Sequence, residues 1–225
     1  MLRQHIETST STATPQYLDV EDFEEVGVRV AERRFCARDL IFAPGDPDGQ
    51  LYFLLEGTVR LYTIYGRYKE ATIALLKDGG IFGELSLDEE GWQNVFAEAV
   101  TSARVAVVRK SVLANVIKRQ PEFIIKLVYS ISERLRQSDE VIESLLDREV
   151  SARLTTLLLN LGDRFGEVDG SGVVLNVRLT HQDLANMIFS TREAVSKVMS
   201  EFQRDGLIEV RNRKIAINPQ LAKTS

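Results

Sequence analysis

Short apolar runs separated by Gly, Pro and Asp dominate the first half of the chain, from Phe35 to Val108. Strand-length runs with a turn signal about every ten residues are typical of a compact antiparallel barrel or jelly roll. The segment PGDPDG, residues 44–49, cannot continue a strand and is predicted to form a tight reversal. We therefore expect an N-terminal antiparallel β-roll over residues 21–120, preceded by a disordered Ser/Thr-rich lead-in over residues 1–20.

The pattern becomes helical after Gln120. From Glu122 to about Asp147, seven residues recur at intervals of four and three, which predicts a long helix over residues 121–147 with a coiled-coil seam. The seam consists of Ile124, Val128, Ile131, Leu135, Ser138, Ile142 and Leu145. A narrow seam of this length usually packs against a copy of itself, so we expect a homodimer. The alternative is a helix that lies on its own β-roll.

The remaining segment, residues 148–225, combines helical stretches with a hairpin pattern. A helix is predicted from about Glu149 to Phe165, followed by a break at GEVDGSG and a strand at VVLNVRL. Two short amphipathic helices then lie between Leu179 and Ile208. The final GLIEVRNRKIAI has two apolar runs around RNRK, which indicates a wing with a basic tip. These patterns predict an α+β fold with a C-terminal winged helix-turn-helix.

The two short helices carry their own start signals. Thr180 and Asp183 have the spacing of a capping box, with Asp in place of Glu. The break between the helices is only Phe189-Ser190, and Ser190 or Thr191 can cap the second helix. The apolar sides that we expect to be buried consist of Leu184, Ala185, Ile188, Val195, Val198 and Phe202.

Polar residues cluster near the N-terminus of the second short helix. Arginine can bond guanine bidentately and glutamate can accept from cytosine N4, so Arg192 and Glu193 could read one G·C step. Ser196 and Lys197 lie one turn further on and could reach a base or a phosphate. This is the second-helix arrangement of a helix-turn-helix. The alternative is an ordinary charged face in contact with solvent.

Net charge at first argues against a nucleic-acid partner, because the chain carries −5 overall. However, residues 148–225 hold 11 Lys or Arg against 9 Asp or Glu, whereas the rest holds 17 against 24. The positive excess is therefore local to the segment with the two short helices.

Cysteine and histidine counts restrict the chemistry further. Cys36 is the only cysteine, which excludes an intrachain disulfide and four-cysteine iron–sulfur or zinc sites. We expect Cys36 to be a core residue, with a redox switch as the alternative. His5 and His181 give little basis for a metal or haem site, so we expect no cofactor. No apolar run approaches ~18 residues and no secretory signal is evident, so we expect a cytoplasmic protein without membrane contact.

Several motifs occur in the order typical of one family. STREAVSKVMSEFQRDGLI, following LTHQDLANMI, resembles the helix-turn-helix signature of the cyclic-AMP receptor protein and fumarate–nitrate regulator (Crp/Fnr) superfamily. The resemblance runs from about Phe35 to Ile217 and includes PGD, YFLLEGTVRLY and FGELSL. It implies a cyclic-nucleotide-binding-like jelly roll, a dimerisation helix, binding of double-stranded DNA at an inverted repeat, and contact with RNA polymerase.

The resemblance assigns roles to residues on the DNA side. Arg192, Glu193 and Lys197 occupy the base-reading positions of the recognition helix. The other expected DNA contacts, mainly to phosphates, are Thr180, Gln182, Ser190, Thr191, Ser196, Arg211, Arg213 and Lys214. Relatives usually have Gly in the turn, where this chain has Phe189. If the backbone needs a positive φ there, phenylalanine costs roughly 1 kcal/mol.

The resemblance also implies an effector site beside the dimerisation helix. GIFGELSL matches the segment that cradles the ribose-phosphate of cyclic AMP, with Glu84 as the ribose-binding glutamate. Ser138 stands where a cyclic-AMP relative offers a hydroxyl to the purine, although a polar residue that fixes the helix register is an equal alternative. The expected effector positions are Gly83, Glu84, Leu85, Ser86, Tyr129 and Ser138.

The cations that known effectors need are missing from their usual places. Cyclic-AMP binders have an arginine–serine pair after the glutamate, but residues 88–103 contain no Arg or Lys. The chain is also similar to nitrogen-control regulators that bind 2-oxoglutarate, yet Val95 and Tyr129 stand where two arginines would bind that dianion. An anion buried without a cation is costly. A cyclic nucleotide, 2-oxoglutarate, another ligand and no ligand therefore all stay open.

Two other classes of function are alternatives to a DNA-binding regulator. The first is a ligand-sensing signalling module whose winged domain docks a protein instead of DNA. The second is an enzyme on a cupin-like roll, which needs clustered histidine and carboxylate ligands. No histidine lies between His5 and His181, so we do not expect an enzyme.

Overall fold

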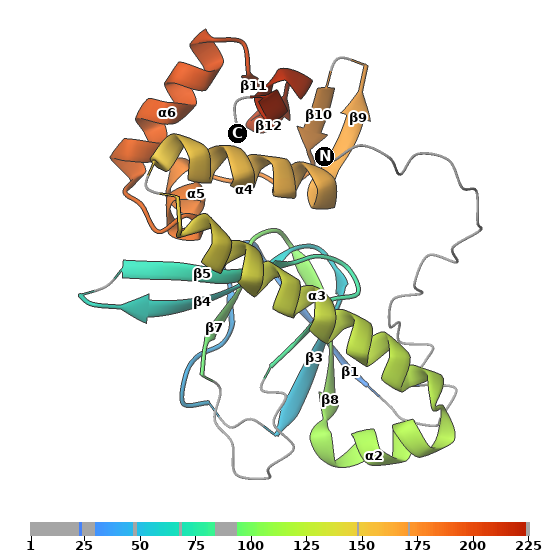
Figure 1. Ribbon diagram of the computed structural model, residues 1–225. Helices are drawn as coiled ribbons and strands as arrows, with labels where there is room; N and C mark the ends of the chain where they lie inside the picture. Colours follow the sequence, from blue (N-terminus) through green and yellow to red (C-terminus); the bar gives the residue numbers. More distant parts are fainter. Residues whose placement is uncertain are drawn as a thin grey trace.

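The computed structural model describes residues 23, 30–46, 49–67, 69–83, 94–147, 149–170 and 172–223. Figure 1 shows a β-rich N-terminal part, a long helix that crosses it diagonally, and a C-terminal part of helices and a small sheet. This arrangement confirms the predicted α+β fold class.

Two four-stranded antiparallel sheets form the N-terminal part, as the alternation of apolar runs and turns predicted. The first has the order β1-β8-β3-β6, with strands Ala31–Phe35, Ala103–Arg109, Gln50–Glu56 and Ile81–Phe82. The second has the order β2-β7-β4-β5, with strands Leu40–Phe42, Phe96–Ala99, Val59–Tyr65 and Lys69–Leu76.

Strand β3 is apolar on both faces because it separates two cores. Tyr52 and Leu54 point into the core between the two sheets. Leu51 and Phe53 point the other way, where Phe53 makes edge-to-face contacts with Phe23 and Phe123. Phe123 belongs to the long helix, so the outer face of β3 fixes where that helix begins.

Helices α2 (Lys110–Arg119) and α3 (Glu122–Ser144) follow the roll. Helix α3 ends three residues before the predicted Asp147. One of its faces packs on β5 and β6, where Ser130 accepts a hydrogen bond from the Ile81 amide and Gln137 accepts one from the Leu75 amide. The side chains of α3 thereby satisfy backbone groups of the roll, which anchors the helix.

The C-terminal part contains α4 (Val150–Phe165), α5 (His181–Met187), α6 (Arg192–Arg204) and a 3₁₀ turn, η1 (Pro219–Lys223). Its sheet has the order β11-β12-β10-β9, with strands Ile208–Arg211, Lys214–Ile217, Gly172–Leu175 and Gly166–Asp169. GEVDGSG is therefore more than a break, because its first four residues form β9, paired with β10. VVLNVRL forms a strand only up to Leu175.

Two further expectations can be compared with the structure. Cys36 is exposed, just after β1, so its assignment to the core was wrong. Its amide donates to Asp39 Oδ2 in the turn between β1 and β2, which keeps the residue at the surface. None of the helices in the described ranges is long and apolar enough to cross a membrane.

Candidate nucleic-acid interface

The first helix of the motif, α5, begins with the predicted capping box. The Asp183 amide donates to Thr180 Oγ1 at 3.1 Å, and the Thr180 amide donates to Asp183 Oδ2 at 2.8 Å. Two amides at the helix start are thus satisfied locally. All six apolar residues predicted to lie between the two short helices are buried: Leu184, Ala185, Ile188, Val195, Val198 and Phe202.

The turn between the helices contains a phenylalanine in a left-handed conformation. Phe189 has a φ of 53°. The backbone therefore has the positive φ that the glycine of relatives suggested as a condition for this turn. Its ring centroid lies 6.4 Å from that of Tyr65 at the end of β4. The β4–β5 hairpin therefore contacts the turn of the DNA-binding motif. A glycine at this position could not make that contact.

The second helix, α6, begins at Arg192 and presents charged residues at its N-terminal end. Thr191 Oγ1 accepts from the Ala194 amide at 3.2 Å, so Thr191, not Ser190, is the cap. Arg192, Glu193 and Lys197 are exposed. Within the described part of the chain, none of these three side chains has an ion pair or a side-chain hydrogen bond. Their charges are available to an external partner.

Two other predicted contact residues already have partners inside the motif. Ser196 Oγ lies 2.8 Å from His181 Nδ1, and Gln182 donates to Asn186 Oδ1 at 2.7 Å. The pair His181–Ser196 links α5 to α6 across 15 residues of sequence. Sequence reasoning did not identify this role of His181, because no local spacing signals it.

The wing is the predicted hairpin. Strands β11 and β12 pair in register from Ile208 opposite Ile217 to Arg211 opposite Lys214. The two turn residues Asn212 and Arg213 have φ values of 51° and 63°. Two consecutive positive φ values are typical of a type I′ turn, whose twist matches that of the strands. The side chain of Arg213 is exposed at the tip, whereas Arg211 pairs with Glu209 and Lys214 donates to Asn176.

A polar network that the sequence did not reveal joins α5 to the β-roll. Arg38, in the turn after β1, donates to both carboxylate oxygens of Asp183, at 3.1 and 3.0 Å. Arg38 has a φ of 75°, so its backbone is also left-handed. Asn186 of α5 donates to Glu70 of β5 at 3.0 Å. Both contacts connect helix α5 to residues more than 100 positions away.

Inside the roll the network continues through Arg60, which is 4% exposed. Arg60 lies 3.0 Å from Glu98 and 2.8 Å from Glu70, and Glu98 lies 3.3 Å from Arg38. Burial opposes the charge of Arg60, but the hydrogen bond that Arg60 donates to Glu98 and the negative charges of Glu98 and Glu70 outweigh it and raise the pKa of Arg60. A buried cation is thus compensated by two carboxylates.

Asp183 is the point where the capping box meets this network. Its side chain is 5% exposed, and burial by itself would raise its pKa. Hydrogen bonds from Arg38 and Thr180 oppose burial, and together they hold the pKa of Asp183 below its ordinary value. One carboxylate therefore both starts α5 and ties it to the roll.

The predicted effector positions do not converge on one described site. Glu84, Leu85 and Ser86 lie outside the described residues. Gly83, at the end of β6, has a φ of +104°, and a Cβ there would lie 3.1 Å from the Gln50 carbonyl oxygen. Tyr129 lines a cavity between the roll and α3, whereas Ser138 does not line it and donates to the Arg134 carbonyl oxygen. No cluster of metal-ligating side chains occurs among the described residues.

The predicted seam of α3 is exposed in the single chain. Ile124, Val128, Ile131, Leu135, Ile142 and Leu145 are between 40% and 62% exposed. The residues of α3 that donate or accept hydrogen bonds at the roll, Ser130 and Gln137, are not members of the seam, and the seventh member, Ser138, is partly buried. A strip of apolar side chains thus remains without a partner in the single chain.

Comparison with known proteins identifies both ends of the molecule. Residues 32–120 match the cyclic nucleotide-binding domain, and residues 152–220 match the Crp-like helix-turn-helix domain. The chain is 32% identical to the global nitrogen regulator of Nostoc sp., over 79% of this chain and 81% of that protein. It is 33% identical to the cyclic AMP receptor protein of Thermus thermophilus, over 76% of each chain.

A solved structure gives the same result. The structure of a CRP/FNR-family transcriptional regulator from Thermus thermophilus matches with a TM-score of 0.69 and 30% identity, covering 86% of this chain and 97% of that one. Family members are transcription regulators. The chain therefore belongs to the Crp/Fnr family of DNA-binding transcription regulators.

Proposed function

We propose that the protein acts in the cytoplasm as a homodimer that regulates transcription by binding an inverted repeat in double-stranded DNA. The observation that carries this proposal is the exposed group Arg192, Glu193 and Lys197 at the start of a capped helix, without partners among the described residues. Arg192 and Glu193 have the chemistry to read a G·C pair, with Lys197 one turn further on.

The exposed seam on α3 supports the dimer. Six apolar side chains in a coiled-coil pattern would be costly to leave in water, and pairing with a second copy would bury them. Two-fold symmetry would then present two α6 helices to successive major grooves, about 34 Å apart. Half-sites of an inverted repeat have the matching symmetry.

Phosphate contacts would supply affinity without sequence preference. Arg213 at the wing tip is exposed, and Arg211 and Lys214 flank it. We also assign phosphate contacts to five polar residues of α5, α6 and the turn between them: Thr180, Gln182, Ser190, Thr191 and Ser196. We assign contact with RNA polymerase on the strength of family membership alone.

The functional units we propose are residues 21–120 for effector sensing, 121–147 for dimerisation and 148–225 for DNA binding. The effector site lacks an arginine in the place where cyclic nucleotides are neutralised, since residues 88–103 contain no Arg or Lys. Relatives are named for nitrogen regulation and for cyclic AMP, and cyclic AMP is an anion that needs a cation.

The test is selection of bound sequences from random DNA, followed by titrations on the selected site and on unrelated DNA. We expect Arg192→Ala to cost about 1–3 kcal/mol on the selected site and to relax preference at one base pair in each half. Arg204→Ala is the matched control, because Arg204 is an exposed arginine at the opposite end of the same helix. Equal loss on selected and unrelated DNA would contradict the reading role. No enrichment of any inverted repeat would contradict the function itself, and a protein-docking role for the winged domain would then be favoured.

A further inference from the structure

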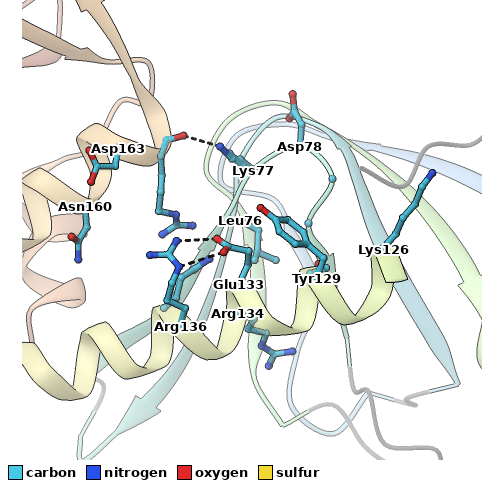
Figure 2. Close-up of a pocket in the computed structure, with 15 residues that line it drawn as sticks. Leu76, Lys77, Asp78, Lys126, Tyr129, Glu133, Arg134, Arg136, Asn160 and Asp163 are labelled. Carbon is cyan, nitrogen blue, oxygen red and sulfur yellow. Dashed lines mark hydrogen bonds and ion pairs between the residues drawn. The ribbon is translucent and has the colours of Figure 1, made fainter. Parts of the chain in front are cut away.

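A cavity of about 350 Å³ lies where the three parts of the molecule meet. Its walls are the turn between β5 and β6, the middle of α3 and the end of α4, as Figure 2 shows. Lys77 extends from the turn, Tyr129 and Arg136 from α3, and Asn160 from α4. The cavity is thus lined by the effector-type roll, the dimerisation helix and the DNA-binding part together.

The charge of the cavity is opposite to that of the protein. Five of its lining side chains are Lys or Arg and three are Asp or Glu, although the chain as a whole carries −5. A concave site with an excess of one charge attracts ligands of the opposite sign. The cavity therefore favours an anion.

The cations in the cavity differ in how far they are already neutralised. Arg136 pairs with Glu133 at 2.9 Å and also with Glu140, and the dashed lines in Figure 2 mark its contacts with Glu133. Arg164, by contrast, has no ion pair with any residue that the structure describes. Its guanidinium donates to the Leu75 carbonyl oxygen and lies 5.1 Å from the Phe165 ring.

Arg164 is also substantially desolvated. Burial lowers the pKa of Arg164, and the more distant charges of Glu140 and Glu133 only partly offset that effect. A guanidinium remains charged at neutral pH, so this is a half-buried cation whose direct contacts are a carbonyl oxygen and an aromatic ring. An anion in the cavity would supply the missing counter-charge.

We propose that this cavity binds a small metabolite through a carboxylate or phosphate group, with Arg164 as the principal cation and Lys77 as the second. The proposal rests on the proposed function, because the cavity supplies the cation that residues 88–103 of the effector domain lack. Asn160, whose Nδ2 also donates to Glu140 at 3.2 Å, offers a side-chain amide, and Tyr129 offers an aromatic ring to the rest of the ligand. The site takes its cation from α4, and it does not include Gly83 or Ser138.

Such a ligand would affect how the DNA-binding part is oriented relative to the β-roll. Lys77 belongs to the roll and already donates to the Arg164 carbonyl oxygen at 3.1 Å, so the two walls touch at the cavity. An anion held between Lys77 and Arg164 would stabilise this contact over arrangements in which α4 leaves the roll. The ligand would then bias the orientation of the DNA-reading helices.

The experiment measures binding of anions to the full-length protein by calorimetry and thermal shift at constant ionic strength. The probes are inorganic phosphate, citrate, 2-oxoglutarate and cyclic AMP, so that carboxylate and phosphate chemistry are tested separately. We expect at least one probe to bind saturably to the wild type, and Arg164→Gln to weaken that binding about tenfold or more. Arg104→Gln, at an exposed ion pair on β8, should leave binding unchanged. Failure of all four probes to bind, or equal binding to R164Q, overturns the proposal.

A second readout separates ligand binding from a purely structural role of Arg164 in capping the β5 edge. We expect Arg164→Met to keep the melting temperature of the anion-free protein while abolishing its rise with the anion. An equal loss of melting temperature with and without the anion would assign Arg164 to the structure alone and overturn the proposal. The R164Q variant without added anion should still select an inverted repeat from random DNA. This result tests the proposed function independently of the cavity, so failure of one proposal can be told from failure of the other.

Discussion

The two helices of the DNA-binding motif, α5 and α6, differ in the environment of their polar and charged side chains. On α5, Asp183 and Asn186 are buried and have partners in the β-roll. On α6, Arg192 and Lys197 are exposed and have no partner among the residues described. Charged side chains that connect two parts of a protein are paired and desolvated. Charged side chains that bind an external ligand remain accessible to solvent. The same motif thus has one side for the fold and one for DNA.

The seam of α3 extends this comparison to apolar groups, and its disruption should have the largest effect. Leu135→Glu places a charge at the centre of the proposed dimer interface, so we expect loss of the dimer and of inverted-repeat binding. Sedimentation and DNA titration measure both. Ser132→Glu adds the same charge beside the seam, where charged residues are tolerated, and should leave the dimer intact. A dimeric Leu135→Glu protein would show that the exposed strip has another partner.

The second prediction concerns the ion pair between Asp183 of α5 and Arg38 of the β-roll. Asp183→Asn keeps the size of the side chain but removes its charge, so we expect the free energy of unfolding to fall by about 1–3 kcal/mol. Arg38→Gln should cost less, because half of the Arg38 side chain is exposed. In the double variant the two losses should not add, since each removes the same ion pair. Additive losses in urea denaturation would mean that the roll and α5 are not coupled through this pair.

Acid should weaken the same contact. The pKa of Asp183 is lower in the folded protein than its ordinary value, so the folded state binds this proton less readily than the unfolded chain. Its stabilising contribution is complete above the unfolded value of about 3.9 and is lost as the pH falls through the folded pKa. The stability difference between wild type and Asp183→Asn should therefore shrink below about pH 4 and stay constant above about pH 5. A difference that persists unchanged in acid would contradict this assignment.

The smallest expected effect concerns the turn. Phe189→Gly removes the strain of a positive φ, worth about 1 kcal/mol, but also removes the ring contact with Tyr65. We expect a coupling of about 0.5 kcal/mol between Tyr65→Ala and Phe189→Gly in a double-mutant cycle, at the weak end for aromatic pairs because the centroids are 6.4 Å apart. Zero coupling would mean that the two rings are neighbours without mutual stabilisation.

Much of the local structure followed from spacing along the chain. The capping box at Thr180, the buried sides of α5 and α6, the wing and the seam were all predicted from residues within a few positions of one another. Caps, helix faces and hairpin turns depend on short-range geometry, so neighbouring residues suffice to predict them. The positive φ at Phe189 was raised only as a condition, because relatives of the resembled family have Gly there, and the structure shows that it is present.

What the sequence by itself determined was therefore most of the elements, the charged residues at the start of α6 and the family to which the chain belongs, whereas strand β9 was missed. Only the tertiary structure decided which distant residues meet: Arg38 with Asp183, Tyr65 with Phe189, and Arg164 with the cavity between α3 and β5. It also placed Cys36 at the surface, against expectation. The physical reason is that a charged or aromatic side chain can be satisfied by many partners, and no local pattern specifies which partner the folded chain brings near.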